Sequence, residues 1–244
     1  LNLKGLSNNR KGILPGGLAI LNSFCKEMGI ERLSVSDNAL REGVLNDLVG
    51  RMKNQDIRDT TVKKLLELYE LDAAQSLRVN DTADYIFNCL KSSWGLCKIE
   101  HFCYLNWAAS LSEIGLTVSF SQFHKHGAYL LRNLDMPGFS EKEKKILSLL
   151  VRAQRRKFPT REFLYLNPSE KEKLVKISVI FRLSLLLHRS RSDFPFQKCS
   201  FEVSDNLLNI QFPVDWLRKH SLTLADLHAE KEYLKAIAID LRFN

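Results

Sequence analysis

Residues 55–191 form a succession of amphipathic segments, and this run constrains the fold more than any other feature of the chain. Apolar residues recur at helical spacing in 59–69, 73–90, 99–114, 125–133, 141–156 and 169–190. Ser140 stands before the fifth of these segments, and Glu143 follows it at the spacing of a capping box. The pattern predicts an all-helical domain over residues 55–195.

The two ends of the chain differ from this run. Pro15-Gly16-Gly17 is expected to break the chain just before a helix at 18–28, and residues 32–37 alternate like one short strand. A single strand forms no sheet, so we interpret residues 1–54 as the remnant of a larger lobe. The sequence begins at Leu1 in mid-motif, and we expect it to be part of a longer protein.

The last 49 residues, 196–244, are predicted to form a small α+β unit. The pattern alternates around Ser204-Asp205-Asn206 as in a β-hairpin, and helices at 214–220 and 223–237 precede a closing strand that ends at 243. The chain as a whole is therefore expected to be mainly α.

The positive charge is concentrated in one segment. Residues 151–191 contain eleven Lys or Arg and three acids, an excess equal to the +8 of the whole chain. Such localisation favours a basic surface that binds a polyanion, although a solvated face of two helices is the simpler alternative.

The cysteines and the length of the apolar runs indicate the cellular compartment. Five cysteines, an odd number, sit in apolar helical patterns, which favours reduced, buried thiols in a cytoplasmic protein. No apolar run reaches the roughly 20 residues of a membrane span, since Arg182 interrupts the strongest candidate, "ISVIFRLSLLLH".

The segment "LSEIGLTVSFSQFHKHGAYLL", residues 111–131, is similar to the metal site of helical His-Asp (HD) phosphohydrolases. On that pattern Gln75 stands at the first His, and Ser112-Glu113 stands at the His-Asp pair. Gln and Ser are poor metal ligands, so we predict a vestigial site with no metal, in which Glu113 makes a buried polar contact with His126. An HD phosphohydrolase active in its own right is the alternative.

Several stretches together resemble the exopolyphosphatase / guanosine pentaphosphate phosphohydrolase (Ppx/GppA) family. They are "ILPGGLAIL", "VSDNALREGVLNDL" and "WAASLSEIGLTVSFSQFHKHGAYLLRNLDMPGFSEKE", followed by "LLVRAQRRK" and "FPVDWL". The resemblance covers nearly the whole chain and is closer to the longer, exopolyphosphatase type.

This resemblance implies a fold and indicates which parts of the whole protein would carry out catalysis. Members have two actin-like (ASKHA) lobes, whose cleft holds phosphate-binding loops, a Mg²⁺ ion and a catalytic Glu. All of these would lie before Leu1, so no catalytic residue is expected here and the fragment alone should be inactive. This chain would hold the end of the second lobe, a degenerate HD-like domain and the C-terminal unit. Residues expected at the rim of the catalytic cleft are Gly16, Gly17, Asp37, Arg41 and Glu42.

The implied substrate is inorganic polyphosphate or pppGpp, and the resemblance does not decide between them. A homodimer is also implied. The basic segment would grip the polyanion, whereas few aromatic residues interleave with its charges, which argues against nucleic acid as the partner. A non-enzymatic nucleic-acid-binding module is the remaining alternative. The predicted polyphosphate-binding residues are Arg152, Arg155, Arg156, Lys157, Lys173, Lys176, Arg182 and Arg189.

Overall fold

The structure is a computed structural model that describes residues 7–33, 56–96, 99–192 and 199–244. The chain divides into two compact units, residues 1–37 and 38–244. The domain boundaries predicted at 54/55 and 195/196 fall outside the described residues and stay predictions.

In the first unit, α1 (Asn8–Lys11) is followed by α2 (Leu14–Glu27). The sequence prediction was wrong about the start of α2, because Pro15, Gly16 and Gly17 belong to its first turn and do not precede it. Proline is tolerated there, since N–H groups of the first turn have no intrahelical acceptor. The strand predicted at 32–37 lies mostly outside the described residues, which end at position 33 in this unit.

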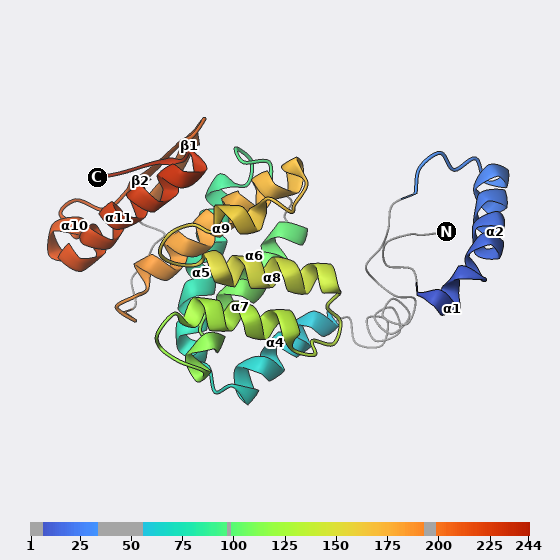
Figure 1. The fold of residues 1–244 in the computed structure, drawn as a ribbon. Helices are drawn as coiled ribbons and strands as arrows, with labels where there is room; N and C mark the ends of the chain where they lie inside the picture. The colour runs from blue at the N-terminus through green and yellow to red at the C-terminus, as the bar shows by residue number, and fades with distance from the viewer. Residues whose placement is uncertain (1–6, 34–55, 97–98, 193–198) are drawn as a thin grey trace. The chain divides into compact units, whose positions relative to one another are not determined.

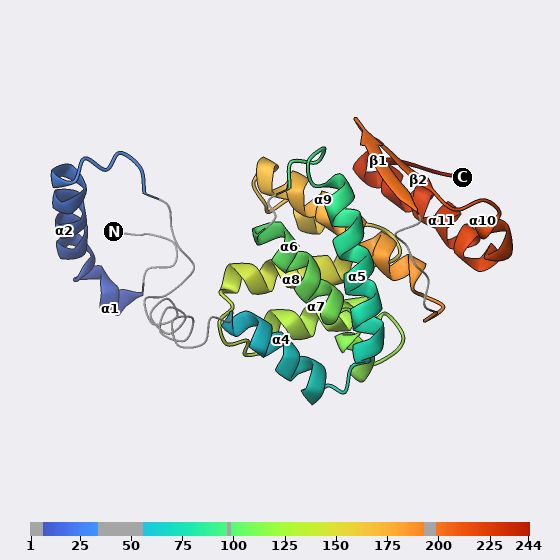
Figure 2. The same ribbon diagram turned by 180° about the vertical axis from the view of Figure 1, so that it is seen from behind.

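The second unit begins with the predicted run of helices (Figures 1 and 2). Figure 1 shows α7 and α8 side by side on one face, and Figure 2 shows α5 on the opposite face. Helix α9 packs against α5, α6 and α8 and so occupies the centre. The elements are α4 (Ile57–Leu68), α5 (Ala73–Leu90), α6 (Glu100–Ser110), η1 (Ile114–Thr117), α7 (Phe123–Asn133), α8 (Glu141–Ala153), η2 (Thr160–Phe163) and α9 (Pro168–Leu187).

Helix α9 is buried on all sides along its second half. Ile177, Ile180 and Phe181 are inaccessible to solvent, and the hydroxyls of Ser178 and Ser184 donate to carbonyl oxygens one turn earlier at 2.8 and 2.9 Å. These internal bonds satisfy polar groups that would otherwise be costly to bury. The helix that the sequence marked as basic is therefore the core helix of the unit.

Side-chain caps fix where the helices begin. Asp72 accepts from the backbone N–H of Gln75 at 2.9 Å at the start of α5, and Asn167 accepts from Glu170 at 2.8 Å at the start of α9. The capping box predicted for Ser140 and Glu143 is confirmed at the start of α8.

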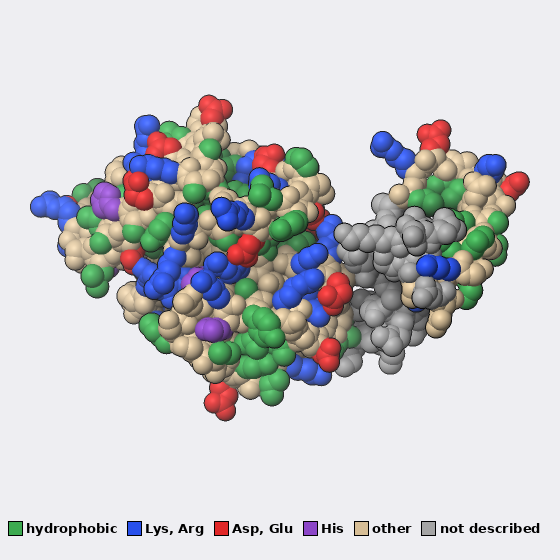
Figure 3. Space-filling view, in the orientation of Figure 1, with side chains coloured by type: hydrophobic (Ala, Val, Ile, Leu, Met, Phe, Trp, Pro, Cys, Tyr) green, Lys and Arg blue, Asp and Glu red, His purple; other side chains and the backbone are tan. Residues whose placement is uncertain are grey.

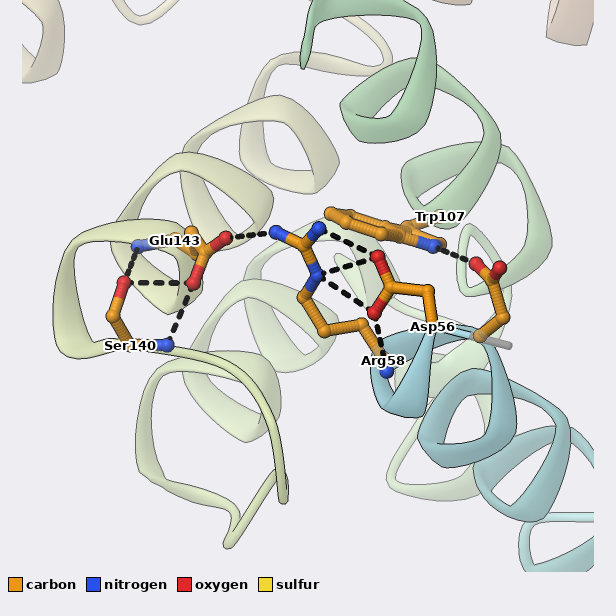
Figure 4. Close-up of polar contacts among 6 residues, drawn as sticks. Asp56, Arg58, Trp107, Ser140 and Glu143 are labelled. Atoms are coloured by element: carbon orange, nitrogen blue, oxygen red, sulfur yellow. Dashed lines mark hydrogen bonds and ion pairs between the residues drawn. The ribbon is translucent and has the colours of Figure 1, made fainter. Parts of the chain in front are cut away.

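One arginine, Arg58, connects the starts of α4 and α8 (Figure 4). Arg58 bonds to the N-cap carboxylate of Asp56 and to Glu143 of the capping box, and its guanidinium lies 4.6 Å from the ring centre of Trp107. The Trp107 indole N–H donates to Asp59 at 2.7 Å. This network joins α4, α6 and α8.

The helix predicted at 99–114 is shorter in the structure, and Gly115, just after the predicted segment, has another role. Helix α6 already ends at Ser110, and Gly115 lies inside η1. A Cβ on Gly115 would be 1.9 Å from the carbonyl oxygen of Phe123 and 2.4 Å from the backbone nitrogen of Gly127. The glycine thus allows η1 to approach the backbone of α7.

The chain closes with the predicted α+β unit, which has a three-stranded sheet in the order β1-β2-β3. β1 (Ser200–Ser204) and β2 (Leu207–Gln211) form the expected hairpin, and β3 (Asp240–Phe243) pairs with β2 in parallel. Between β2 and β3 the chain forms α10 (Trp216–Lys219), α11 (Ser221–Leu234) and η4 (Lys235–Ile237). Helix α11 packs on both α9 and β3, which attaches this unit to the helices.

The mainly helical fold with a small C-terminal sheet is confirmed, whereas the actin-like remnant and the HD-like relationship stay expectations. None of the described helices is long and apolar enough to span a membrane. The four described cysteines are free, but only Cys199 is buried and Cys89 is exposed, so the expectation of buried thiols was wrong for most of them.

Candidate functional site

A cleft of about 520 Å³ opens in the second unit between α9, α11 and the chain around α7. Its wall carries five arginines, Arg155, Arg156, Arg182, Arg189 and Arg191, against three acids, Glu113, Asp226 and Glu230. Figure 3 shows Lys and Arg side chains gathered on this face, near the C-terminal end of α9. We name this site the arginine cleft.

Arg182 forms the floor of the cleft and holds α11 to α9. Its side chain is 1% exposed and makes a two-point ion pair with Glu230, with Nη2 to Oε2 at 2.7 Å. It also donates to the carbonyl oxygens of Ala153 and Arg156. The prediction that Arg182 binds polyphosphate disagrees with this geometry, because its donors are already used inside the protein.

Arg189 and Arg191 lie at the edge of the cleft and are paired with acids. Arg189 bonds to Asp226 on α11, and Arg191 bonds to Asp72 and, at 2.7 Å, to Glu113. Both arginine side chains are about half exposed, at 52% and 45%. Exposed pairs of this kind are weak, so an incoming anion can compete for these guanidiniums.

Arg155 has no acceptor for part of its guanidinium. The group lies 4.8 Å from the ring centre of Phe123, and its Nε is buried without a hydrogen-bond partner in the described part of the chain. Burial lowers the pKa of Arg155, and the nearby Arg156 and Arg189 lower it further. Arg155 is half-buried and lines the cleft, and none of the described acids forms an ion pair with it. A guanidinium in this position is available to an anion.

Arg156 is exposed and has a left-handed backbone, with φ 60°. Its carbonyl oxygen accepts a 2.8 Å hydrogen bond from Arg182, which holds this conformation. A non-glycine residue in this region is uncommon and is often found at functional sites. The buried pair below the cleft thus positions Arg156 on its wall.

The histidine below these arginines stays neutral. Burial lowers the pKa of His124 to about 4, and the positive charges of Arg152, Arg155 and Arg156 act in the same direction. Its side chain is 3% exposed. A positive charge on the imidazole of His124 would be repelled by the arginines around it.

Two of the four predicted vestigial positions line the same cleft, whereas Ser112 and His126 do not. Gln75 and Glu113 line it, and Gln154 donates to the backbone carbonyl of Ser112 at 3.0 Å. The predicted contact between Glu113 and His126 was wrong, because the Glu113 carboxylate is bound by Arg191.

These positions do not fit a divalent cation. Gln75 uses its amide to bond the backbone of His188 and the side chain of Arg78, and the one carboxylate, Glu113, is already held by an arginine. Among the residues that the structure describes, no group of three or more His, Cys, Asp or Glu is placed to hold a metal ion.

The other four predicted polyphosphate-binding residues do not line the cleft, so the eight predicted residues do not form one continuous surface. Arg152 pairs with Glu162, Lys173 donates to the carbonyl of Trp94, and Lys176 pairs with Glu172. Lys157 is exposed but does not line the cleft.

The residues predicted at the rim of a catalytic cleft lie near the N-terminal end of the sequence, and none of them lines the arginine cleft. Gly16 and Gly17 lie in the first turn of α2, and a Cβ at either position would meet no atom within 4 Å. Asp37, Arg41 and Glu42 lie outside the described residues, so their role stays a prediction.

Three features of the cleft were missed at the level of sequence. Arg191 was counted as a charge but not as a site residue. Phe120 and Phe123 line the cleft although the basic segment has few aromatics of its own. The acids that neutralise the arginines lie far from them along the chain: Glu230 and Asp226 on α11 pair with Arg182 and Arg189, and Asp72 and Glu113 pair with Arg191.

The arrangement is suited to binding an anion. It offers guanidinium donors, which match phosphate oxygens in bidentate geometry. Each of its three acids is bonded to an arginine, which leaves none of them placed as a free general base.

Comparisons with known proteins agree with the sequence blocks. Residues 57–231 match domain III of the Ppx/GppA phosphatases, and residues 1–52 match the Ppx/GppA phosphatase family. The chain is similar to proteins named guanosine-5'-triphosphate,3'-diphosphate pyrophosphatase. It is 35% identical to that of Aeromonas hydrophila subsp. hydrophila, covering 95% of this chain and 47% of the relative. It is 34% identical to that of Aeromonas salmonicida, covering 95% and 47%.

A third such protein, from Pseudoalteromonas translucida, is 33% identical over 95% of this chain and 46% of its own length. The chain thus spans about half the length of the curated relatives it matches. The match to domain III alone covers well over half of the chain. The chain therefore belongs to the Ppx/GppA phosphatase family.

Proposed function

We propose that this chain is part of a phosphatase that hydrolyses the terminal phosphate of pppGpp or of inorganic polyphosphate, and that the arginine cleft binds the phosphate chain of the substrate. Arg155 and Arg156 are the principal contacts, and Arg189 contributes when the anion competes with Asp226. The observation that carries this proposal is that Arg155 and Arg156 line the cleft while none of the described acids forms an ion pair with either of them. Arg182 has a structural role.

The proposed substrate class rests on chemistry shared by both candidates. Each carries a linear run of phosphates, and guanidinium groups at several points can hold such a run without recognising any other part of the molecule. The names of the relatives favour pppGpp, whereas the cleft arginines suit either anion. The hydrolytic step, its Mg²⁺ ion and its catalytic Glu are expected from residues outside this chain.

Binding of tripolyphosphate to the 244-residue chain tests the proposal. Isothermal titration calorimetry should show binding that weakens as salt screens the charges. Replacing Arg155 and Arg156 together by Gln should reduce the affinity by at least roughly tenfold, because hydrogen bonds to charged groups are worth about 1.5–3 kcal/mol each. Unchanged affinity in this variant would rule out the cleft as the site.

Arg218→Gln is the matched control. Arg218 is an exposed arginine in an ion pair with Asp215, and it does not line the cleft. This substitution removes one positive charge outside the cleft and should leave tripolyphosphate binding unchanged.

The homodimer implied by the resemblance is part of the proposal for the whole protein. Sedimentation equilibrium of the 244-residue chain tests whether this region contributes to it. A monomer at all concentrations would assign the dimer contacts to other parts of the protein.

A further inference from the structure

We propose that a second pocket of this chain binds a small apolar carboxylate. The pocket lies between η2, the first half of α9, η4 and the turn of the β1–β2 hairpin, and we name it the η2–η4 pocket. It shares no lining residue with the arginine cleft, so this inference is independent of the proposed function.

The size and place of the η2–η4 pocket suit a small molecule. Its volume is about 610 Å³, within the range of about 300–1,000 Å³ that is typical of small-molecule sites. It is formed jointly by the helical part of the second unit and by the C-terminal α+β unit, and binding sites are common where two such parts meet. A ligand in the pocket would therefore contact both parts.

The side chains that such a ligand would touch are mostly apolar. Val175, Ile237 and Ile239 line the pocket and are half-buried, and Leu164 adds a side chain that is 66% exposed. Ala238 ends η4 with a left-handed backbone, φ 58°, and this tight helix end brings Ile237 and Ile239 to the same pocket. An alkyl or aryl group bound against these residues would remove apolar surface from water on both sides. The main part of the ligand should thus be apolar.

Two buried aromatic rings support this lining. Phe158 and Phe163 are 2% and 0% exposed, and their ring centres are 5.0 Å apart. The guanidinium of Arg182 lies 5.9 Å from the ring centre of Phe158 and is itself held by Glu230. Because these groups are packed without a ligand, the pocket is a preformed part of the fold.

The polar end of the ligand is identified by Lys171. This residue lines the pocket, is half-buried and forms no ion pair with any of the described acids. The neighbouring Lys176 is paired with Glu172 at 2.5 Å. Of the described lining residues, Lys171 is therefore the cation available to a ligand, and a carboxylate can accept its hydrogen bonds.

Asp205 on the hairpin turn raises the opposite choice, a cationic ligand, since it lines the pocket and has no ion-pair partner among the described residues. Two observations favour the carboxylate. Asp205 is exposed, so water and salt screen its charge more than that of the half-buried Lys171. Lys171 also lies near the start of α9, where the helix dipole favours a negative charge.

Isothermal titration calorimetry of the 244-residue chain with octanoate tests the pocket. The wild type should bind octanoate at least roughly tenfold more tightly than octylammonium, which has the same length of alkyl chain and the opposite charge. Hexanoate is shorter by two methylenes and should bind roughly tenfold more weakly than octanoate, because each buried methylene changes the affinity about fourfold.

Two substitutions locate the bound octanoate. Lys171→Gln should weaken its binding roughly tenfold, because the carboxylate loses its charged donor. Ala236→Trp should abolish binding, because Ala236 is exposed and lines the pocket, so that an indole at this position fills the cavity. The midpoint of thermal unfolding of Ala236→Trp should match that of the wild type, which separates filling of the pocket from loss of the fold.

Ala74→Trp is the matched control. Ala74 is an exposed alanine at the start of α5, and it does not line the pocket. This variant should bind octanoate like the wild type.

The outcomes separate this pocket from the arginine cleft. Loss of octanoate binding when Arg155 and Arg156 are replaced by Gln, with no loss in Ala236→Trp, would place the carboxylate in the arginine cleft and overturn the inference. Tighter binding of octylammonium than of octanoate, or equal binding of hexanoate and octanoate, would also overturn it. A wild type that binds tripolyphosphate but no octanoate would overturn this inference alone and leave the proposed function standing.

Discussion

At the scale of single residues, His124 shows how burial and the nearby arginines lower the pKa of a neighbouring side chain. Its imidazole is buried below Arg155 and Arg156, and its pKa is lowered to about 4. An unfolded histidine titrates near pH 6.5. Between these two values the unfolded chain binds a proton that the folded protein excludes, so stability is full above about pH 6.5 and is lost as the pH falls toward 4.

Replacement of His124 by Gln should flatten this pH dependence, because the titrating group is removed. The midpoint of thermal unfolding, measured from pH 4.5 to pH 7.5, should rise with pH less steeply in His124→Gln than in the wild type. An identical slope in the two proteins would show that His124 does not contribute to the acid sensitivity.

At the scale of secondary-structure elements, the packing of η1 on α7 depends on Gly115. A methyl group there would overlap the backbone of α7, which cannot move aside as a flexible side chain can. Gly115→Ala should lower the free energy of unfolding by about 3 kcal/mol, at the upper end of what overpacking costs. Urea denaturation measures this loss.

Gly127→Ala provides a graded comparison on α7. A Cβ on Gly127 would be 3.0 Å from a side-chain methyl of Val151 and 3.3 Å from the backbone nitrogen of Gly115. Its cost should be smaller, because the closest atom belongs to a side chain. A Gly115→Ala variant as stable as the wild type would contradict the role of this glycine.

At the scale of the whole second unit, the buried pair Arg182–Glu230 joins the central helix to the C-terminal unit. Glu230→Ala leaves a buried arginine without its partner and should cost about 3–5 kcal/mol of unfolding free energy. Asp226→Ala removes a half-buried acid one turn earlier on α11, where it pairs with the more exposed Arg189, and should cost less than about 1 kcal/mol. Similar losses in the two variants, measured by urea denaturation, would refute the buried pair as the main attachment.

The pairing of the cleft acids with arginines gives a prediction about activity. Because the cleft holds anion-binding groups and the acids on its wall are each paired with an arginine, the 244-residue chain should release no phosphate from pppGpp or polyphosphate in the presence of Mg²⁺. A malachite green assay for phosphate measures this, and turnover by the purified chain would contradict it.

Local signals in the sequence were sufficient to predict the order and approximate limits of the helices. Residues 73–90 were predicted as a helix with the bounds that the structure shows, since the Asp72 cap and the apolar spacing are both local signals. The capping box at Ser140 and the hairpin of β1 and β2 follow from the same kind of local information. Family membership was also visible, because it depends on blocks of consecutive residues.

Which charges act together depends on the three-dimensional packing of the chain. Arg155 and Arg182 both belong to the basic segment, yet one has a donor without an acceptor and the other is buried against Glu230, 48 positions later. Phe120 reaches the cleft although it precedes the basic segment by some thirty residues. Burial and ion pairing are set by neighbours in space, and the spacing of charges along the chain does not specify those neighbours.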